Sequence, residues 1–314
     1  MVAGAPRYRP CARHRAPPGT RRGPPFRSPE PAGDRLSGPG VYDCKGGLAL
    51  CVAACRIWAR EGWPACPVTI VINADEEIGS LSSRPLIEAA AVEARAALVV
   101  EPAPALDKVI TARKGIGRYI LRVFGRAAHA GADREAGVNA LVDLAAKILA
   151  LERLNDGQGD FSVTVGTAAG GIRPNIVPDY AQAEIDLRLT NPASVEAALA
   201  AINRAAAETR VVGARYRLEG EITRPPMPEN DGGRALFALA ERIGRPLGLN
   251  LNAAASGGGS DGNFCAALGV PTLDGLGPAG AGAHAEHEHI LVSSLAPRLA
   301  LLCELGWELG KCKT

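Results

Sequence analysis

The sequence predicts an α/β protein, with a mostly parallel sheet covered by helices on both faces and an α+β unit inserted into it. Helical and strand-like segments alternate in the outer parts of the chain, a pattern typical of parallel sheets joined by crossover helices. In the middle, the expected order is strand, strand, helix, strand, strand, helix, strand. The 314 residues are 47% hydrophobic and 22% charged, so the chain can bury a sizeable core.

The elements of the larger unit follow from periodicity and residue preference. Residues 46–60 are rich in Ala and place Leu50, Ala54 and Ile57 on one face, as an amphipathic helix does. The β-branched run 68–73 predicts a strand. The other expected helices are 84–94, 234–243 and 293–309, and the other expected strands are 97–100 and 271–273.

The inserted unit covers residues 111–224 and divides the larger unit into residues 34–110 and 225–314. Its strands are expected at 118–124, 161–166, 181–189 and 215–219, after a strand at 108–113, and its helices at 139–154 and 195–209. Residues 1–33 are crowded with Arg and Pro and show no periodicity, because each Pro removes a backbone donor and fixes φ. We expect this first segment to be disordered, and its many Arg residues also fit a transit peptide.

Charge and cysteine usage exclude several classes of protein. The 35 Lys and Arg residues against 33 Asp and Glu residues leave a net charge of +2, which gives no sign of a nucleic-acid surface. No apolar run resembles a membrane span or a signal peptide. Eight cysteines occur without a Cys-x-x-Cys pair, so we expect reduced thiols and a cytoplasmic protein that binds neither nucleic acid nor membrane.

Polar residues gather in five segments that lie at strand ends or in Gly-rich loops. These are the places where an open α/β sheet binds its ligands. The segments are 38–47, 73–80, 101–102, 255–263 and 282–289.

Each segment alone also has a simpler interpretation. Asp43 is suited to cap the helix that follows it, and residues 75–77 are suited to a solvated acidic loop. Glu101 could mark the exit of a strand into water, residues 257–259 could be a flexible linker, and residues 282–289 a polar loop.

Taken together, the five segments favour a metal-dependent hydrolase. Three consecutive carboxylates repel one another, which a cation would relieve. Carboxylate and imidazole ligands suit zinc without any thiolate, and two metal ions are a common arrangement for hydrolysis. The candidate residues are Asp43, Glu76, Glu77, Glu101 and His284.

Four motifs, GPGVYDCKGG, ADEEIGS, LVVEPA and SGGGSDGNFCAALGVPTLDGLGPAGAGAH, occur in this order from Gly38 onward. In this order and spacing they resemble the zinc metallopeptidase family of glutamate carboxypeptidase, acetylornithine deacetylase, succinyl-diaminopimelate desuccinylase and the aminoacylases. The glutamate carboxypeptidase branch is the most similar. The resemblance implies a zinc-exopeptidase-like catalytic domain at 34–110 and 225–314 and a ferredoxin-like dimerisation domain at 111–224.

The resemblance also implies roles for the candidate ligands. Asp43 would bridge two zinc ions, while Glu77, Glu101 and His284 would each complete the ligands of one ion. Glu76 would be the general base that takes a proton from the attacking water. Cobalt or manganese would fit the same ligands, and Cys44 stands where Met is common in the family.

Further residues match positions that contact the substrate in the family. His129 would cross to the partner subunit's active site in a homodimer and stabilise the oxyanion, although a lone His at a strand end is more often structural. Asn175 and Arg188 would contact the substrate, Arg188 as a bidentate clamp on a carboxylate, with an ion pair to Asp186 or Glu184 as the alternative. The remaining pocket residues would be Gly258, Gly259, Ser260 and Asp261.

The acidic and imidazole groups after His284 are less informative. We interpret His287 and His289 as solvated loop residues. Glu288 matches a recurrent acidic position of the family, for which the sequence gives no role.

The motif with which the family opens is absent from this sequence. In the family a strand-rich segment ends in Gly-His-x-Asp-Thr-Val, whose His binds one metal, whereas His14 is followed two residues later by Ala16. With suitable codons, a one-base shift across residues 13–19 would read Asp-Thr-Val-His-Pro-Pro-Gly. We therefore hypothesise a wrong reading frame in this segment, which makes the catalytic domain incomplete at its amino-terminal side.

Three functional hypotheses remain. The first is a homodimeric dinuclear zinc hydrolase that cleaves a peptide or N-acyl amide bond next to a carboxylate, in a small peptide or an N-acyl amino acid. The second is an inactive relative that only dimerises or binds a metal or ligand. The third is a mononuclear metal-binding protein without hydrolysis.

Overall fold

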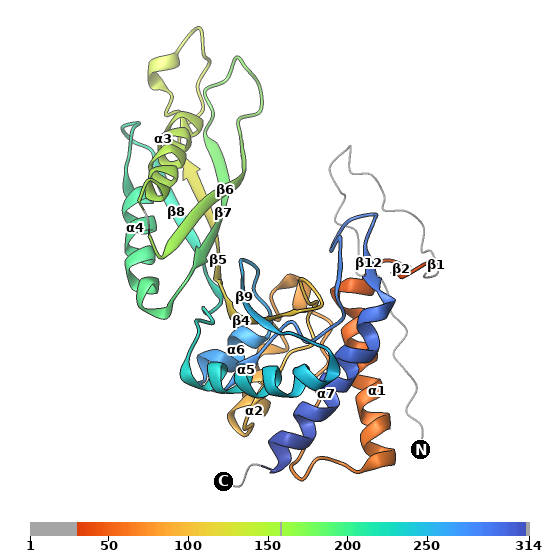
Figure 1. The fold of residues 1–314 in the computed structure, drawn as a ribbon. Helices are drawn as coiled ribbons and strands as arrows, with labels where there is room; N and C mark the ends of the chain where they lie inside the picture. The colour runs from red at the N-terminus through yellow and green to blue at the C-terminus, as the bar shows by residue number, and fades with distance from the viewer. Residues whose placement is uncertain (1–29, 158, 312–314) are drawn as a thin grey trace, which may run out of the picture.

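The computed structural model describes residues 30–157 and 159–311. Most of the segment that we expect to be disordered, residues 1–29, lies outside this part of the chain. The expectation is wrong for residues 30–32, which form strand β1 and pair with β2. Figure 1 shows two bodies, one built around α1, α5 and α7 and the other around a sheet covered by α3 and α4.

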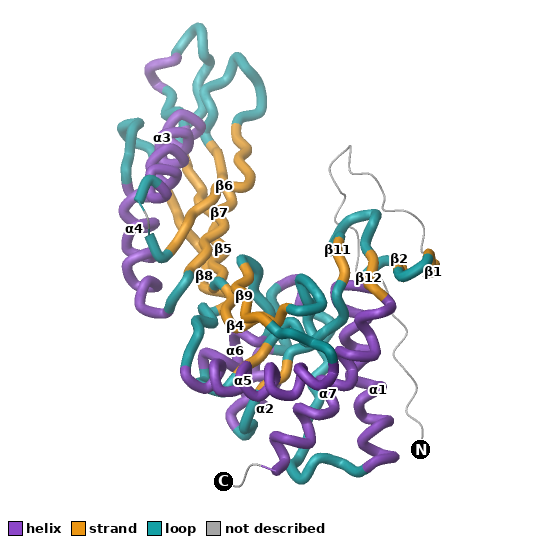
Figure 2. The backbone as a smooth tube through the Cα atoms, in the orientation of Figure 1, coloured by secondary structure: helices purple, strands orange, loops and turns teal. Residues whose placement is uncertain are grey.

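The larger body confirms the α/β class. Its sheet is broken into short pieces joined by loops (Figure 2): β3 pairs with β10 and β4 with β9, both in parallel, while β1, β2, β12 and β11 form an antiparallel sheet in that order. Helix α1 packs against α7 (Figure 1), and Leu50, Trp58 and Leu301 lie in the core between the helices and the strands.

The elements of the larger body are β1 (Glu30–Ala32), β2 (Arg35–Ser37), the irregular turn η1 (Val41–Lys45), α1 (Gly46–Glu61), the helical turn η2 (Glu76–Ile78), α2 (Arg84–Val92), β3 (Ala97–Leu98), β4 (Lys108–Arg113), α5 (Asp231–Gly244), η6 (Arg245–Leu247), β9 (Asn252–Ser256), α6 (Gly262–Ala267), β10 (Thr272–Leu273), β11 (Gly280–Ala281), β12 (His289–Leu291) and α7 (Val292–Lys311). No helix in the described ranges is long and apolar enough to cross a membrane.

The strand predicted at 68–73 is not formed. Within the described residues this run pairs with no strand, and four of its apolar side chains are exposed, namely Val68, Ile70, Val71 and Ile72. A β-branched run favours extended backbone, but a strand also needs a neighbour to accept and donate its ladder hydrogen bonds. The residue preference is therefore present without the partner that would complete the strand.

The inserted body is a four-stranded antiparallel sheet in the order β6-β7-β5-β8. Its chain order, βαββαβ, and its strand order are those of a ferredoxin-like unit. Both helices pack on one face of the sheet (Figure 1). The elements are β5 (Gly115–Phe124), η3 (Arg134–Ala136), α3 (Ala140–Glu152), η4 (Arg153–Asn155), β6 (Phe161–Gly170), β7 (Tyr180–Leu189), η5 (Pro192–Ser194), α4 (Val195–Ala207) and β8 (Arg215–Arg224).

Strict alternation along β7 explains which face the helices cover. Ala181, Ala183, Ile185, Leu187 and Leu189 are buried against α3 and α4, whereas the intervening polar residues lie on the uncovered face, as the two-residue period of a strand requires. Strand β4 pairs with β9 as far as Arg113, so residues 111–113, which the sequence predicts as part of the inserted unit, lie in the sheet of the larger body.

A buried ion pair ties the two helices of the inserted body together. Lys147 on α3 is fully buried; its Nζ lies 3.4 Å from Asp143 Oδ2 and donates to the carbonyl oxygens of Ala206 and Glu208 at 2.7 and 2.6 Å. Asp143 Oδ1 accepts from the backbone N–H of Arg210 at 2.6 Å. Lys147 thus donates the hydrogen bonds that the carbonyl groups at the carboxyl-terminal end of α4 would otherwise lack.

We expect Lys147→Met to lower the free energy of unfolding by about 3 kcal/mol, because it leaves the Asp143 carboxylate buried without its cation. Urea denaturation followed by circular dichroism measures this change. The control is Arg153→Gln, which breaks an exposed pair with Glu208 and should cost less than about 1 kcal/mol. Equal effects of the two variants would contradict the prediction.

Candidate metal centre

Four of the predicted ligands meet at one cavity of about 840 Å³ between the two bodies. Asp43, Glu77, Glu101 and His284 all line it, although they come from four separate loops. The inserted body contributes the ends of β5 and β8 to the wall of the cavity. Candidate ligands that lie far apart in the sequence therefore meet at a single site.

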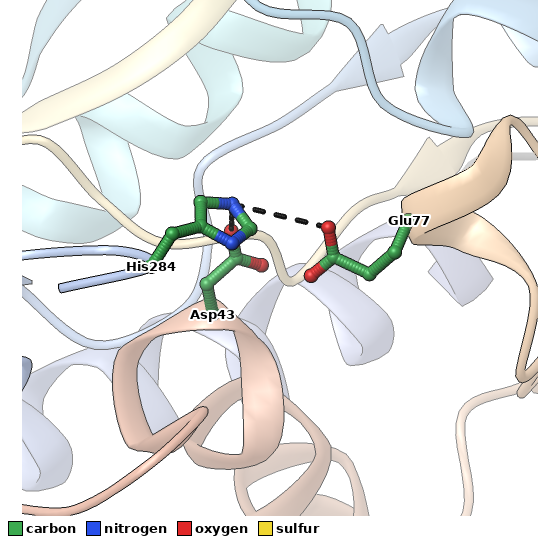
Figure 3. Close-up of side chains that lie close together, drawn as sticks. All are labelled: Asp43, Glu77 and His284. Carbon is green, nitrogen blue, oxygen red and sulfur yellow. Dashed lines mark ion pairs between the residues drawn. The ribbon is translucent and has the colours of Figure 1, made fainter. Parts of the chain in front are cut away.

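Asp43, Glu77 and His284 point toward one another (Figure 3). His284 Nε2 lies 3.3 Å from Asp43 Oδ2 and 3.9 Å from Glu77 Oε2, and one donor atom of each residue lies within 4.8 Å of the others. Since zinc bonds to N and O ligands are about 2.0–2.2 Å long, atoms at this spacing can surround one ion. The residues fit a zinc-type cation.

Asp43 also belongs to a second group of donor atoms. An oxygen of Asp43, the sulfur of Cys44 and an oxygen of Glu101 lie within 4.8 Å of one another. Burial, and then the carboxylates of Asp274, Asp43 and Glu76, raise the pKa of Glu101 to about 8. Such crowding of carboxylates is relieved when a cation lies among them.

Glu288 holds the turn that carries Asp43. Its buried carboxylate accepts hydrogen bonds from the backbone N–H groups of Gly40, Tyr42 and Asp43 at 2.6, 3.0 and 2.9 Å. The turn starts at Gly40, which has a positive φ of 67°, a conformation that glycine adopts without steric cost. The sequence singled out Glu288 but gave it no role, and the structure shows that it fixes the backbone of the Asp43 turn.

Glu76 and Glu77 are adjacent in the turn η2 but have different partners. Glu77 belongs to the group in Figure 3, whereas Glu76 Oε1 lies 2.7 Å from Arg224 Nη2. Burial raises the pKa of Glu76, and the Arg224 charge opposes this shift. Both carboxylates line the same cavity.

Arg224, at the end of β8, is a functional candidate that sequence reasoning missed. It is 3% exposed and connects both bodies: Nη2 donates to Glu76 O at 2.9 Å, and Nη1 donates to Asp261 Oδ1 at 2.8 Å. Asp261 in turn accepts from Asn73 Nδ2 at 2.8 Å and from Ser80 Oγ at 2.5 Å. These contacts hold the Glu76 turn against residues 255–263, the Gly-rich loop.

Arg113 was also missed. It forms a buried bidentate pair with Asp274, at 2.6 Å from Nε to Oδ2 and 2.8 Å from Nη2 to Oδ1, and Nη1 donates to Gly258 O at 3.2 Å. Its partner is 161 residues away, a distance at which no periodicity connects two charges. Arg113 lines the cavity beneath the Gly-rich loop.

The predicted residues of the Gly-rich loop divide into two pairs. Gly258 and Gly259 line the cavity, while Ser260 and Asp261 are absent from its lining. Ser260 is buried and donates from Oγ to Asp274 Oδ2 at 2.5 Å. Ser260 and Asp261 therefore hold the loop in place and do not line the cavity.

His129, Asn175 and Arg188 do not line the cavity of their own chain. His129 is exposed, and Ala130 N donates to Asn175 O at 2.9 Å, so the two predicted residues lie together. His129 Nδ1 accepts from the N–H groups of Gly131 and Ala132, which leaves the proton of a neutral ring on Nε2. Arg188 binds Asp186, at 2.6 Å from Nε to Oδ1, and Gly257 O at 3.1 Å.

The two histidines that follow His284 lie apart from the centre. His287 and His289 do not line the cavity, and His287 is exposed.

All six described cysteines are free thiols: Cys44, Cys51, Cys55, Cys66, Cys265 and Cys303. Cys11 and Cys312 lie outside the described residues. Burial, and then nearby carboxylates, raise the pKa of Cys44 to about 12.

We expect Glu288→Gln to weaken zinc binding by about 10- to 100-fold, because the groups that orient a metal ligand contribute this much to affinity. Competition with a chromogenic chelator measures the affinity. Glu286→Gln, an exposed residue of the same loop, is the matched control and should bind zinc as the wild type does. Wild-type affinity in Glu288→Gln would show that the Asp43 turn holds its shape without this carboxylate.

Comparisons with known proteins identify the family to which this chain is similar. The model of peptidase family M20/M25/M40 matches residues 16–307. Carboxypeptidase G2 of Pseudomonas sp. (strain RS-16) is 31% identical over 288 residues, which cover 90% of this chain and 69% of that protein. Succinyl-diaminopimelate desuccinylase of Azoarcus sp. (strain BH72) is 28% identical, over 87% of this chain and 74% of that protein.

Solved structures show the same fold. Aminopeptidase PepT from Bacillus cereus has a TM-score of 0.76 at 25% identity and covers 90% of this chain and 76% of its own. The metallo-carboxypeptidase Sso-CP2 from Sulfolobus solfataricus has a TM-score of 0.71 at 17% identity, over 91% of this chain and 81% of its own. The predicted family resemblance is thus confirmed, and this chain belongs to peptidase family M20/M25/M40, a family of metal-dependent hydrolases.

Proposed function

We propose that this protein is a dinuclear zinc hydrolase of the glutamate carboxypeptidase type, which cleaves a peptide or N-acyl amide bond next to a carboxylate. The proposal is supported by the position of Asp43, which belongs to two groups of potential metal ligands at the cavity that Glu76 also lines. A carboxylate shared by two cations is the arrangement that a two-metal hydrolase needs. Cobalt or manganese would fit the same ligands.

Glu77 and His284 would hold one ion together with Asp43, and Glu101 would hold the other. Bound there, the two ions would supply Lewis acidity toward the scissile carbonyl and lower the pKa of the attacking water. Glu76 accepts the proton of that water and then passes it to the leaving amine. Its raised pKa, caused by burial, brings this carboxylate closer to the neutral range in which a general base works best.

The charges around the cavity favour an anionic substrate. Lys108, Arg113, Arg118 and Arg224 line it, and the backbone of Gly257–Gly259 lies beside them. Lys108 and Arg118 are exposed, so they can pair with a carboxylate that enters from solvent. Arg188 contacts the Gly257 carbonyl and lies next to this loop, where we assign it to the same carboxylate.

We further propose a homodimer in which residues 111–224 form the dimerisation domain. On α3, the apolar side chains of Leu141, Val142 and Leu149 are 40%, 49% and 62% exposed, and β6 is an edge strand of the sheet. Pairing of this surface with a second copy would cover it. It would also explain why His129 and Asn175 lie outside the cavity of their own chain, since they would serve the partner's. The free thiols fit a reducing, cytoplasmic compartment.

We expect Glu76→Gln to lower kcat by at least about 100-fold, as loss of a general base does, with little change in KM or in zinc content. Hydrolysis of folate-type glutamate conjugates and of N-acetyl amino acids by the zinc-loaded chain measures this. Glu93→Gln, an exposed carboxylate outside the cavity lining, is the control. If the wild-type chain binds zinc but cleaves none of these substrates, the chain is an inactive relative and the proposal fails.

Mixing two inactive variants tests the dimer. In a heterodimer of Glu76→Gln and His129→Ala, one of the two active sites receives an intact Glu76 from one subunit and an intact His129 from the other. After joint refolding at equal amounts we expect about a quarter of the wild-type activity, because half of the dimers are mixed and each has one complete site. If activity stays at the sum of the separate variants, His129 acts within its own chain or not at all.

A further inference from the structure

The turn before α1 places a thiol among the carboxylates of the metal centre. Asp43 and Cys44 are consecutive, and their donor atoms lie within 4.8 Å of each other and of a Glu101 oxygen. Asp43 is the residue that this group shares with Glu77 and His284. The two groups therefore lie side by side, and one of them contains sulfur.

We propose that Cys44 is a metal ligand, which forms with Asp43 and Glu101 a site for a thiophilic divalent cation such as zinc. The inference rests on the proposed function, because it names a ligand of the second ion. Zinc binds thiolate sulfur and carboxylate oxygen alike. Three protein ligands leave the fourth tetrahedral position for water or substrate, as hydrolytic zinc sites require.

The backbone brings Cys44 to Glu101 through a close contact. A Cβ on Gly47 would lie 2.0 Å from the carbonyl oxygen of Val100, and a Cβ on Gly46 would lie 2.6 Å from Pro278 Cγ. Only glycine allows this approach. The first turn of α1 can thus pack directly against the strand end that carries Glu101.

The thiol is also held in place from its other side. Glu288 binds the N–H groups of Tyr42 and Asp43, and Lys45 N donates to Gly40 O at 2.8 Å. Cys44 lies between these fixed points and is half-buried. A ligand on such a fixed turn binds an ion with little loss of conformational freedom.

Coordination here is an exchange of a proton for a metal ion. The S–H bond of Cys44 breaks, its proton passes to solvent, and a sulfur–metal bond forms without any transfer of electrons. No other described cysteine belongs to a group of potential ligands. A sulfur signal at the metal would therefore identify Cys44.

X-ray absorption at the zinc edge tests the proposal on the full chain, stripped of metal and reloaded with two equivalents of zinc. We expect a zinc–sulfur distance of about 2.3 Å in the wild type and in the control Cys66→Ser, whose thiol lies outside both groups. In Cys44→Ser the sulfur signal should vanish. Absence of sulfur in the wild type, or its persistence in Cys44→Ser, would overturn the inference.

Two further measurements use the wild-type chain and therefore do not depend on whether a variant folds. Cobalt bound to the wild-type chain should give a thiolate-to-cobalt charge-transfer band in the near ultraviolet. Bound zinc should also protect Cys44, but not Cys66, from alkylation by iodoacetamide, as read by mass spectrometry of the peptides. Equal alkylation of Cys44 with and without zinc would contradict coordination.

Failure of this inference is distinguishable from failure of the proposed function. Hydrolysis that depends on Glu76, with no sulfur at the metal, would overturn the role of Cys44 and leave the hydrolase in place. Sulfur-bound zinc without hydrolysis would overturn the hydrolase and leave the site in place.

Discussion

The carboxylates in one partly buried cavity repel one another, and this repulsion determines which charges are needed around the site. Asp43, Glu76, Glu77 and Glu101 all line the same space, and the pKa of Glu101 is raised to about 8 by burial and by its acidic neighbours. A protein that retains such a cluster needs compensating positive charge. Buried arginines supply part of it at the cavity wall, and in the proposed function bound cations would supply the rest at the centre.

The two buried arginines also join the parts of the site. Arg224 connects the end of the inserted sheet to the Glu76 turn and to Asp261, and Arg113 connects β4 to Asp274 beneath the Gly-rich loop. Because both side chains are almost fully buried, loss of either would leave carboxylates without partners. The position of Glu76, the proposed general base, therefore depends on contacts between the two bodies of the protein.

The sequence predicts best what depends on neighbouring residues. Helices α1 to α5 and α7 lie within a few residues of the expected ranges, since their periodicity is local. The candidate ligands are recognised by the ordered motifs that surround them, and the structure brings them to one cavity. What the sequence could not predict depends on distant partners. The run 68–73 has the composition of a strand but no ladder, and the roles of Glu288, Arg113 and Arg224 come from contacts across roughly 150 to 250 residues.

Anomalous X-ray diffraction from crystals of the zinc-loaded chain would locate the cations relative to Asp43. We predict two anomalous peaks about 3.5–4 Å apart, one on each side of the Asp43 carboxylate, the first beside Glu77 and His284 and the second beside Glu101. A single peak, or two peaks that do not share Asp43, would show that this carboxylate does not bridge two cations.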